Sequence, residues 1–252
     1  MACEFSGTVR DAFLDLGHDA WSCDLKVSES IGPHYRGDVT KILDGWIPVS
    51  YTADCDPDGD GWCYVRDCDP SECKCIGPTQ DGIEYKEIDG ELFGRPIDSP
   101  NWDLMIAHPP CTYLAVSGIH WNSKLKSRNN KTLAALDFVR KLMDAPINRI
   151  CIENPVSVIS SAIRKPDQII QPWHFGHDAS KKTCLWLKNL PPLKETDRLP
   201  GNNATRRKNQ TKSGQNKLGP SVFRQAERSK FYTGIAKAMA EQWGKFICTN
   251  GN

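Results

Sequence analysis

The sequence contains no run of about 18 consecutive apolar residues, so we expect no membrane-spanning helix. Its first eleven residues, MACEFSGTVRD, have no basic stretch leading into an apolar one, so we also expect no secretory signal. Disorder is excluded because eight Trp, eight Phe and six Tyr supply core material in a chain that is 39% hydrophobic. The 252 residues (1–252) fit one large domain with a small insertion.

The chain has eleven cysteines but no expected secretory signal. Disulfide frameworks form in oxidising compartments, which such a chain does not enter. We therefore expect a cytoplasmic protein with reduced cysteines that serve as metal ligands, a catalytic thiol or buried core residues.

Net charge is also nearly absent, with 32 Lys and Arg against 31 Asp and Glu, but the charges are segregated. Residues 54–98 contain 13 acids and 4 bases, whereas residues 201–230 contain 8 bases and one acid. Residues 123–131 add four bases and no acid. Such blocks are often ordinary solvated surface, but two basic loops beside one site would form a phosphate-binding face.

No internal repeat is present, and helical and strand patterns alternate along the chain. Apolar spacing predicts helices over 9–16, 132–143 and 234–243, a helical turn over 39–43, and strands over 20–25, 102–107, 147–152 and 184–187. This alternation predicts an α/β domain with a largely parallel sheet. Two segments interrupt it: a Cys-, Gly- and Asp-rich insertion at 54–100 and a basic, mobile loop at 191–220.

In such sheets, ligands bind at the carboxyl ends of the strands, and two reactive side chains follow predicted strands there. Cys111 comes after Pro109-Pro110, which fix the backbone and present the next side chain rigidly. Glu153 ends the apolar run ICIENP. A thiolate that attacks an electron-poor ring and an acid that protonates it make a plausible catalytic pair.

The chain begins with a pattern typical of adenosine-containing cofactor sites. Cys3-Glu4-Phe5-Ser6-Gly7 reads as a strand end, a glycine turn and the start of a helix, and Asp24 ends the next strand, where an acid binds ribose hydroxyls. The first strand of this fold class lies centrally, and only Met1–Phe5 are available for it. We therefore expect a short central strand of about 3–5 residues.

These motifs together resemble the DNA cytosine-C5 methyltransferase family, in particular its small bacteriophage-encoded members. Family members open with a strand, Asp-Leu-Phe-x-Gly and a helix, similar here to Cys3–Gly7, and then carry an acid, similar to Asp24, and Gly-Asp, similar to Gly37-Asp38. The resemblance implies a Rossmann-like methyltransferase sheet with helices on both faces and S-adenosylmethionine as cofactor. The implied cofactor-binding residues are Phe5, Ser6, Gly7, Asp24, Asp38 and Pro109.

The catalytic motifs carry the same resemblance. The family's Gly-Pro-Pro-Cys is similar to His108–Cys111, its Glu-Asn-Val to Glu153–Pro155, and its Arg-x-Arg before a strand to Lys181-Lys182 before CLWL. The resemblance implies that Cys111 attacks C6 of cytosine, that Glu153 holds N3 and that Lys181 or Lys182 contacts O2. The resemblance implies DNA as the partner, and the target base must leave the duplex stack to be methylated. We expect the enzyme to be a monomer.

The insertion predicts a metal site. Four of its five cysteines would suffice for a tetrahedral structural zinc ion, although no Cys-x-x-Cys knuckle is present. Reduced, unligated cysteines remain an alternative, and Asp56-x-Asp58-x-Asp60-Gly61 resembles the start of a calcium loop. The five candidate zinc ligands are Cys55, Cys63, Cys68, Cys73 and Cys75.

Two other functions remain open. Val9 and Arg10 stand where the family has glycines, which would suit a non-catalytic nucleic-acid-binding relative with a degenerate cofactor site. The short target-recognition region would suit C5 modification of a free pyrimidine nucleotide.

Overall fold

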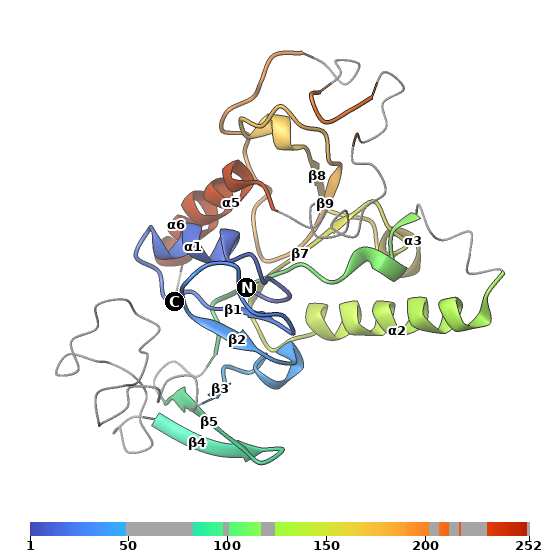
Figure 1. The fold of residues 1–252 in the computed structure, drawn as a ribbon. Helices are drawn as coiled ribbons and strands as arrows, with labels where there is room; N and C mark the ends of the chain where they lie inside the picture. Colours follow the sequence, from blue (N-terminus) through green and yellow to red (C-terminus); the bar gives the residue numbers. More distant parts are fainter. Residues whose placement is uncertain are drawn as a thin grey trace.

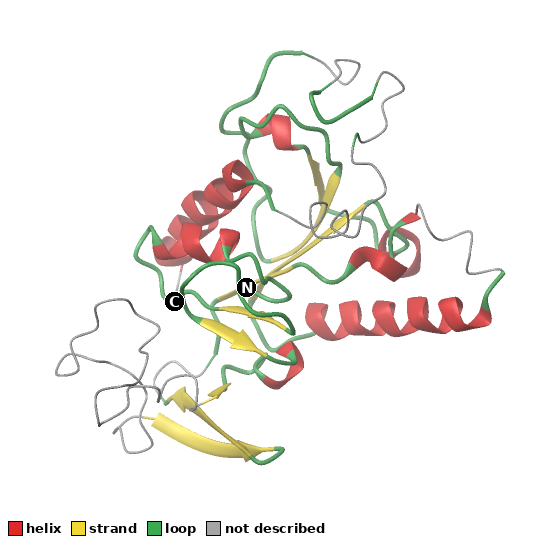
Figure 2. Cartoon of the chain, viewed as in Figure 1, coloured by secondary structure: helices red, strands yellow, loops and turns green. Residues whose placement is uncertain are grey.

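The protein is a mixed α/β chain with several small sheets and few helices (Figure 1, Figure 2). The structure, a computed structural model, describes residues 1–48, 83–97, 101–116, 124–201, 207–211, 217 and 231–250. Its strands are β1 (Ser22–Asp24), β2 (His34–Arg36), β3 (Ile47–Pro48), β4 (Ile83–Ile88), β5 (Glu91–Pro96), β6 (Leu104–Ala107), β7 (Arg149–Pro155), β8 (Gln168–Ile170) and β9 (Thr183–Lys188).

The helices are α1 (Thr8–Leu14), α2 (Lys126–Met143), α3 (Ile159–Ala162), α5 (Thr233–Met239) and α6 (Lys245–Asn250). Shorter turns are the 3-10 helices η1 (Val39–Lys41), η3 (Cys111–Tyr113) and η5 (Pro172–His174) and the π-helical η6 (Ala240–Gly244). Within the described residues, no helix combines the length and the apolar character needed to cross a membrane.

The first residues of the chain lie in the middle of the main sheet. Ala2 makes parallel bridges to Cys23 of β1 on one side and to Ala107 of β6 on the other. The resulting order is β2, β1, the start of the chain, β6, β7, β9 and β8. The expected central position is confirmed. Of the described residues 1–5, only Ala2 forms β-bridges, and Cys3 has a φ of 57°, but backbone hydrogen bonds to both neighbours extend from Met1, which accepts from Cys23 N at 2.8 Å, to Glu4, which donates to Cys23 O at 3.0 Å.

The direction of β9 departs from the predicted largely parallel sheet. β1 pairs with β2, and β6 with β7, in parallel, whereas β9 runs antiparallel to both β7 and β8. Parallel neighbours need a long crossover, usually through a helix, and antiparallel ones do not. Residues 171–182, which connect β8 to β9, contain η5 but no α-helix, so the chain returns in the opposite direction.

Helices cover both faces of this sheet, as expected. Ile106 of β6 and Cys151 of β7 belong to a core cluster with residues of α1 and α5. Their neighbours Met105 and Ile150 belong to a second cluster with residues of α2. This alternation is the two-residue period of a strand, and Figure 1 shows α1, α5 and α6 grouped apart from α2.

Helix α2 begins earlier than its apolar pattern predicts. Leu136, Val139 and Leu142 are buried at helical spacing, as expected, but the helix starts at Lys126 rather than at residue 132. Its polar first turns are held by side-chain bonds to η3, because Arg128 donates to Thr112 O at 3.1 Å and Thr132 to Tyr113 O at 2.9 Å. The first half of α2 is therefore fixed beside Cys111.

The insertion contains a hairpin that the sequence analysis missed. β3, β5 and β4 form an antiparallel sheet, and the β4–β5 turn is Asp89-Gly90, both with positive φ. Asp-Gly between strands is a readable hairpin signal. Fully buried Phe93 packs against Tyr35 at 6.4 Å between ring centroids and joins the hairpin to the core. The five predicted zinc ligands lie outside the described residues.

The structure describes residues 191–201, 207–211 and 217 of the predicted basic loop at 191–220. These residues contain no helix and no β-strand. Its start is anchored to the core, because Leu193 is buried and Trp243 Nε1 donates to Pro191 O at 2.9 Å. A bridge between Phe175 and Asp197 and two hydrogen bonds between Ser180 and Asn209 attach the loop to the residues before β9.

Candidate active site at the carboxyl ends of the strands

Two predicted catalytic residues, Cys111 and Glu153, lie toward the carboxyl ends of β6 and β7. These strands are parallel, with Ala107 opposite Ile152, so His108, which follows β6, lies beside Glu153 near the end of β7. His108 Nδ1 lies 3.1 Å from Glu153 Oε2. Asn154 Nδ2 donates to Pro109 O at 2.7 Å and so ties the two-proline turn to β7. Sequence analysis missed both contacts, which join residues 45 positions apart.

Glu153 is buried, yet its hydrogen bonding is incomplete. Only 6% of the residue is exposed. Oε1 of Glu153, Nε2 of His108 and Oδ1 of Asn154 are buried without a hydrogen-bond partner in the described part of the chain. Buried polar atoms are nearly always paired, so a cluster of unpaired ones indicates a place where a ligand completes the bonding.

The charges around Glu153 favour its ionised form. Burial by itself raises the pKa of Glu153, but the hydrogen bond from His108 and the positive charge of Lys181 outweigh burial and bring the pKa below its ordinary value. Lys181 lies at this edge because β9 pairs with β7 up to Thr183 opposite Pro155. The neighbouring Lys182 acts instead on Cys184: burial raises the pKa of this thiol, and the positive charge of Lys182 offsets only part of that rise.

Cys111 begins η3 directly after the two-proline turn, and its thiol is reduced and exposed. Among the described cysteines, only Cys248 is also exposed, and it lies in α6. Burial raises the pKa of Cys23 to about 12 and raises that of Cys151 further above its usual range, which leaves these two thiols unreactive. Cys111 is therefore the described thiol best placed to act as a nucleophile.

Phe231 adds an aromatic wall that the sequence analysis did not identify. It precedes α5, and its ring meets that of His108 edge-to-face at 4.9 Å between centroids. Two aromatic residues, Phe231 and Tyr232, at the end of a basic segment do not reveal before the fold is known that one of them lines a site. Its contact brings the C-terminal helices to the candidate site.

On the cofactor side, Glu4 caps helix α1. Its Oε1 accepts from Val9 N at 2.6 Å and its Oε2 from Arg10 N at 3.2 Å, while 4% of the residue is exposed. The helix starts after Gly7, whose φ of 71° lies in the left-handed region. A charged residue at the end of the central strand is thus accommodated because the free backbone N–H groups of the helix neutralise it.

The predicted ribose ligand Asp24 and the predicted cofactor-binding residue Asp38 lie at the ends of neighbouring strands. Asp24 ends β1, and Asp38 follows β2 and caps η1. Each uses Oδ1 to accept one backbone N–H at 2.9 Å, from Lys26 and Thr40 respectively. Burial raises the pKa of Cys3 most, and the Cys23 thiol and the carboxylates of Asp24 and Asp38 raise it further. The two carboxylates therefore lie near Cys3.

These two carboxylates beside the glycine turn fit the hydroxyl groups of an adenosine-type cofactor. In the described part of the chain, Oδ2 of Asp24 and Oδ2 of Asp38 have no hydrogen bond, so each retains an acceptor. Phe5 supplies a half-buried ring with Lys26 Nζ 4.4 Å from its centroid. Pro109 lies on the opposite side of the first residues, after β6.

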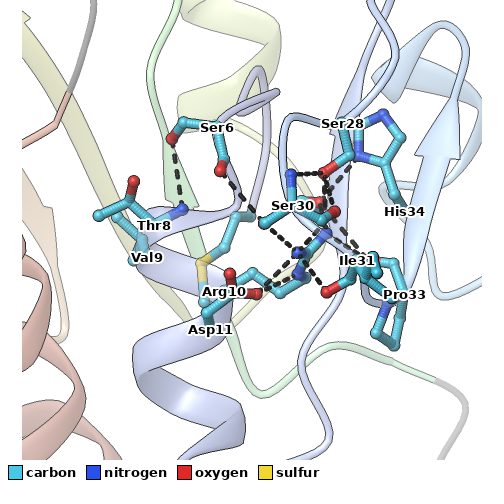
Figure 3. Close-up of polar contacts among 12 residues, drawn as sticks. Ser6, Thr8, Val9, Arg10, Asp11, Ser28, Ser30, Ile31, Pro33 and His34 are labelled. Atoms are coloured by element: carbon cyan, nitrogen blue, oxygen red, sulfur yellow. Dashed lines mark hydrogen bonds and ion pairs between the residues drawn. The ribbon is translucent and has the colours of Figure 1, made fainter. Parts of the chain in front are cut away.

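A buried arginine supports the glycine turn (Figure 3). Arg10 is fully buried and forms an ion pair with Asp11 at 2.7 Å. The segment between β1 and β2 contains no helix, and the guanidinium bonds to its oxygen atoms instead. The acceptors are Ser22 Oγ, Ser28 Oγ, Ser30 O and Oγ, Ile31 O and Pro33 O.

The described residues contain no group of three or more His, Cys, Asp or Glu that could hold a metal ion. Comparison of the chain with protein-family models, curated proteins and solved structures finds no match. Function is therefore inferred from the residues themselves and from their geometry.

Proposed function

We propose that the protein is a DNA cytosine-C5 methyltransferase that uses S-adenosylmethionine. The observation that carries this proposal is the pairing of a buried, incompletely bonded glutamate with a two-proline turn that ends in an exposed thiol. Glu153 and Cys111 come from different strands, and the Asn154–Pro109 hydrogen bond holds those strand ends together.

The chemistry assigns one step to each side chain. The Cys111 thiolate forms a bond to C6 of the base, the C5–C6 double bond is lost, and C5 becomes nucleophilic. Glu153 is assigned to the N3 edge, where its carboxylate accepts from the 4-amino group beside N3. Lys181, whose positive charge acts on Glu153, is assigned to O2, where a cation stabilises the negative charge that addition places on the ring. S-adenosylmethionine, when bound, supplies the methyl group. Transfer of the C5 proton to solvent water and expulsion of the Cys111 thiolate then restore the C5–C6 double bond.

The strand order supports a Rossmann-like methyltransferase sheet. Numbered along the chain, the start of the chain, β1, β2, β6 and β7 lie in the spatial order 3-2-1-4-5, which is that of doubly wound dinucleotide-binding sheets. The order reverses between the start of the chain and β6. Ligands of such sheets bind outside the strand ends at this reversal, where Gly7 and Pro109 lie.

Basic and aromatic groups beside Cys111 support DNA as the substrate. Arg128 and Lys131 of α2 approach the ring of Tyr113 at 5.2 and 5.5 Å from its centroid. Lys124 and Lys126 are exposed next to them. Cations in this position can contact phosphates on either side of an extruded base. Because the resemblance is to bacteriophage proteins, we infer a monomer that acts in the cytoplasm of an infected bacterium.

The decisive test is incubation of the purified protein with labelled S-adenosylmethionine and mixed DNA, followed by nucleoside analysis. The expected product is 5-methylcytosine in DNA, and Cys111→Ser is the matched negative control. If several DNAs contain no 5-methylcytosine although the protein binds the cofactor, the proposal is wrong. Activity on dCMP alone would instead assign a free nucleotide as substrate.

A non-catalytic nucleic-acid-binding protein is the second candidate. The segment after β1 lies against the glycine turn, because Glu29 N donates to Phe5 O at 2.7 Å and Ser30 Oγ to Ser6 O at 3.2 Å. This contact would suit a cofactor site that has lost its function. The alternative predicts DNA binding that weakens steeply with salt and is unchanged by S-adenosylmethionine.

We also propose that the Cys-rich insertion holds one structural zinc ion. Five cysteines within 21 residues provide more than the four thiolates of a tetrahedral site, and a Gly- and Pro-rich segment has little core of its own.

A further inference from the structure

His108 is held in place on two sides. Its backbone N donates to Ala2 O at 2.9 Å, so the residue is fixed to the central segment of the sheet. Phe231 packs against the imidazole, and Nδ1 faces Glu153 Oε2. Only 12% of the side chain is exposed. A side chain so restrained is suited to orient another group.

The hydrogen bond also determines the form of the imidazole. An ionised carboxylate only accepts hydrogen bonds, so Nδ1 must carry the proton and donate it. Glu153 is then bonded through Oε2, while Oε1 remains an unpaired acceptor. Lys181 also faces this carboxylate and favours its ionisation. Cys151 and Cys184 lie nearby: burial raises the pKa of each thiol most, and the charge of Glu153 raises it further.

We propose that His108 is a positioning residue that fixes the Glu153 carboxylate so that Oε1 alone meets the base. This inference rests on the proposed function. An acceptor oxygen in a buried site selects a ring edge that presents an N–H donor, and the 4-amino group of cytosine is such a donor. Without His108, the carboxylate could rotate, and both of its oxygens would lack a hydrogen-bond partner among the residues that the structure describes.

Three substitutions separate positioning from a merely structural role. His108→Asn keeps a donor close to the position of Nδ1, His108→Gln keeps a polar group only near Nε2, and His108→Leu keeps neither. We expect His108→Leu to lower kcat about 10–100-fold, the range that corresponds to one hydrogen bond to a charged group, with little change in the KM for DNA. His108→Asn should restore most of the activity and His108→Gln much less.

The assay is methylation of DNA with labelled S-adenosylmethionine, combined with melting curves and cofactor titrations for each variant. A structural role would lower the melting temperature of all three variants and would not distinguish Asn from Gln. If His108→Leu does not fold, the comparison of kcat between His108→Asn and His108→Gln still distinguishes a positioning role from a structural one.

The outcomes separate the two proposals. An inactive wild-type protein that binds the cofactor refutes the proposed function and this inference with it. An active wild type refutes the inference alone if His108→Leu keeps at least about half of kcat, or if Gln restores activity as well as Asn does.

Discussion

The buried Arg10 offers a sharp test of how the cofactor turn is held. Its guanidinium reaches from α1 to the segment between β1 and β2, where it bonds to three backbone oxygens and to hydroxyl groups of three serines. Arg10→Met keeps a flexible apolar stem in the same space but removes every donor. The backbone oxygens of Ser30, Ile31 and Pro33 then lose the partner that α1 provides.

The expected cost follows from burial. Each buried polar group left unpaired costs about 1–3 kcal/mol, and removal of one member of a buried ion pair costs about 3–5 kcal/mol. The side chain of Asp11 is 38% exposed, so water can solvate the charge that remains, and the lower end applies. We therefore expect Arg10→Met to lower the free energy of unfolding by about 3 kcal/mol. Arg10→Lys keeps the charge but has fewer donors and should be intermediate.

Urea unfolding followed by circular dichroism measures this change. Arg140→Met is the matched control, because Arg140 also pairs with an aspartate, Asp137, at 2.7 Å, but both side chains are largely exposed. A surface pair contributes about 0–1 kcal/mol. If Arg10→Met is no more destabilising than Arg140→Met, the guanidinium does not hold the segment after β1, and the interpretation of the turn is wrong.

Three further predictions concern the thiol, the metal and the buried glutamate. Cys111→Ser should abolish methyl transfer but leave cofactor affinity nearly intact, and a fully active variant would exclude the covalent mechanism. Elemental analysis of protein purified under reducing, chelator-free conditions should find about one zinc per chain, and less than about a tenth of an equivalent would reject the site. The folded state holds the pKa of Glu153 below its ordinary value of 4.5, so the carboxylate stabilises the fold above that pH, and this contribution is lost as pH falls through the folded pKa. The stability advantage of wild type over Glu153→Gln in urea should therefore shrink between about pH 7 and about pH 3, and a constant difference would contradict an ionised pair.

Local patterns predicted the elements that carry the candidate site. The apolar runs of β6, β7 and β9 were readable, and residues directly after a buried strand must lie at its carboxyl end. The positions of Cys111 and Glu153 therefore followed from the sequence. The start of α2 could not be predicted from the sequence, because the polar first turns of this helix depend on hydrogen bonds from Arg128 and Thr132 to η3.

Pairings between distant residues were beyond such patterns. His108 and Glu153 are 45 positions apart, and their contact depends on the register of β6 against β7. The antiparallel direction of β9 depends on whether its connection forms a crossover helix, which composition did not reveal. The β4–β5 hairpin is different, because Asp89-Gly90 was a local signal that was overlooked among the charges of the insertion.

Two buried glutamates in the main sheet, Glu4 after the central segment and Glu153 in β7, show how hydrogen bonding separates a structural role from a functional one. Both oxygens of Glu4 accept backbone N–H groups of α1, so its charge is fully satisfied within the protein and needs no ligand. Glu153 is equally buried, but its Oε1 has no partner in the described residues. Leaving a buried acceptor unpaired is costly, and a fold that only required stability would fill the position with an apolar side chain. The incomplete bonding of Glu153 is therefore the strongest sign that this edge of the sheet binds a polar ring.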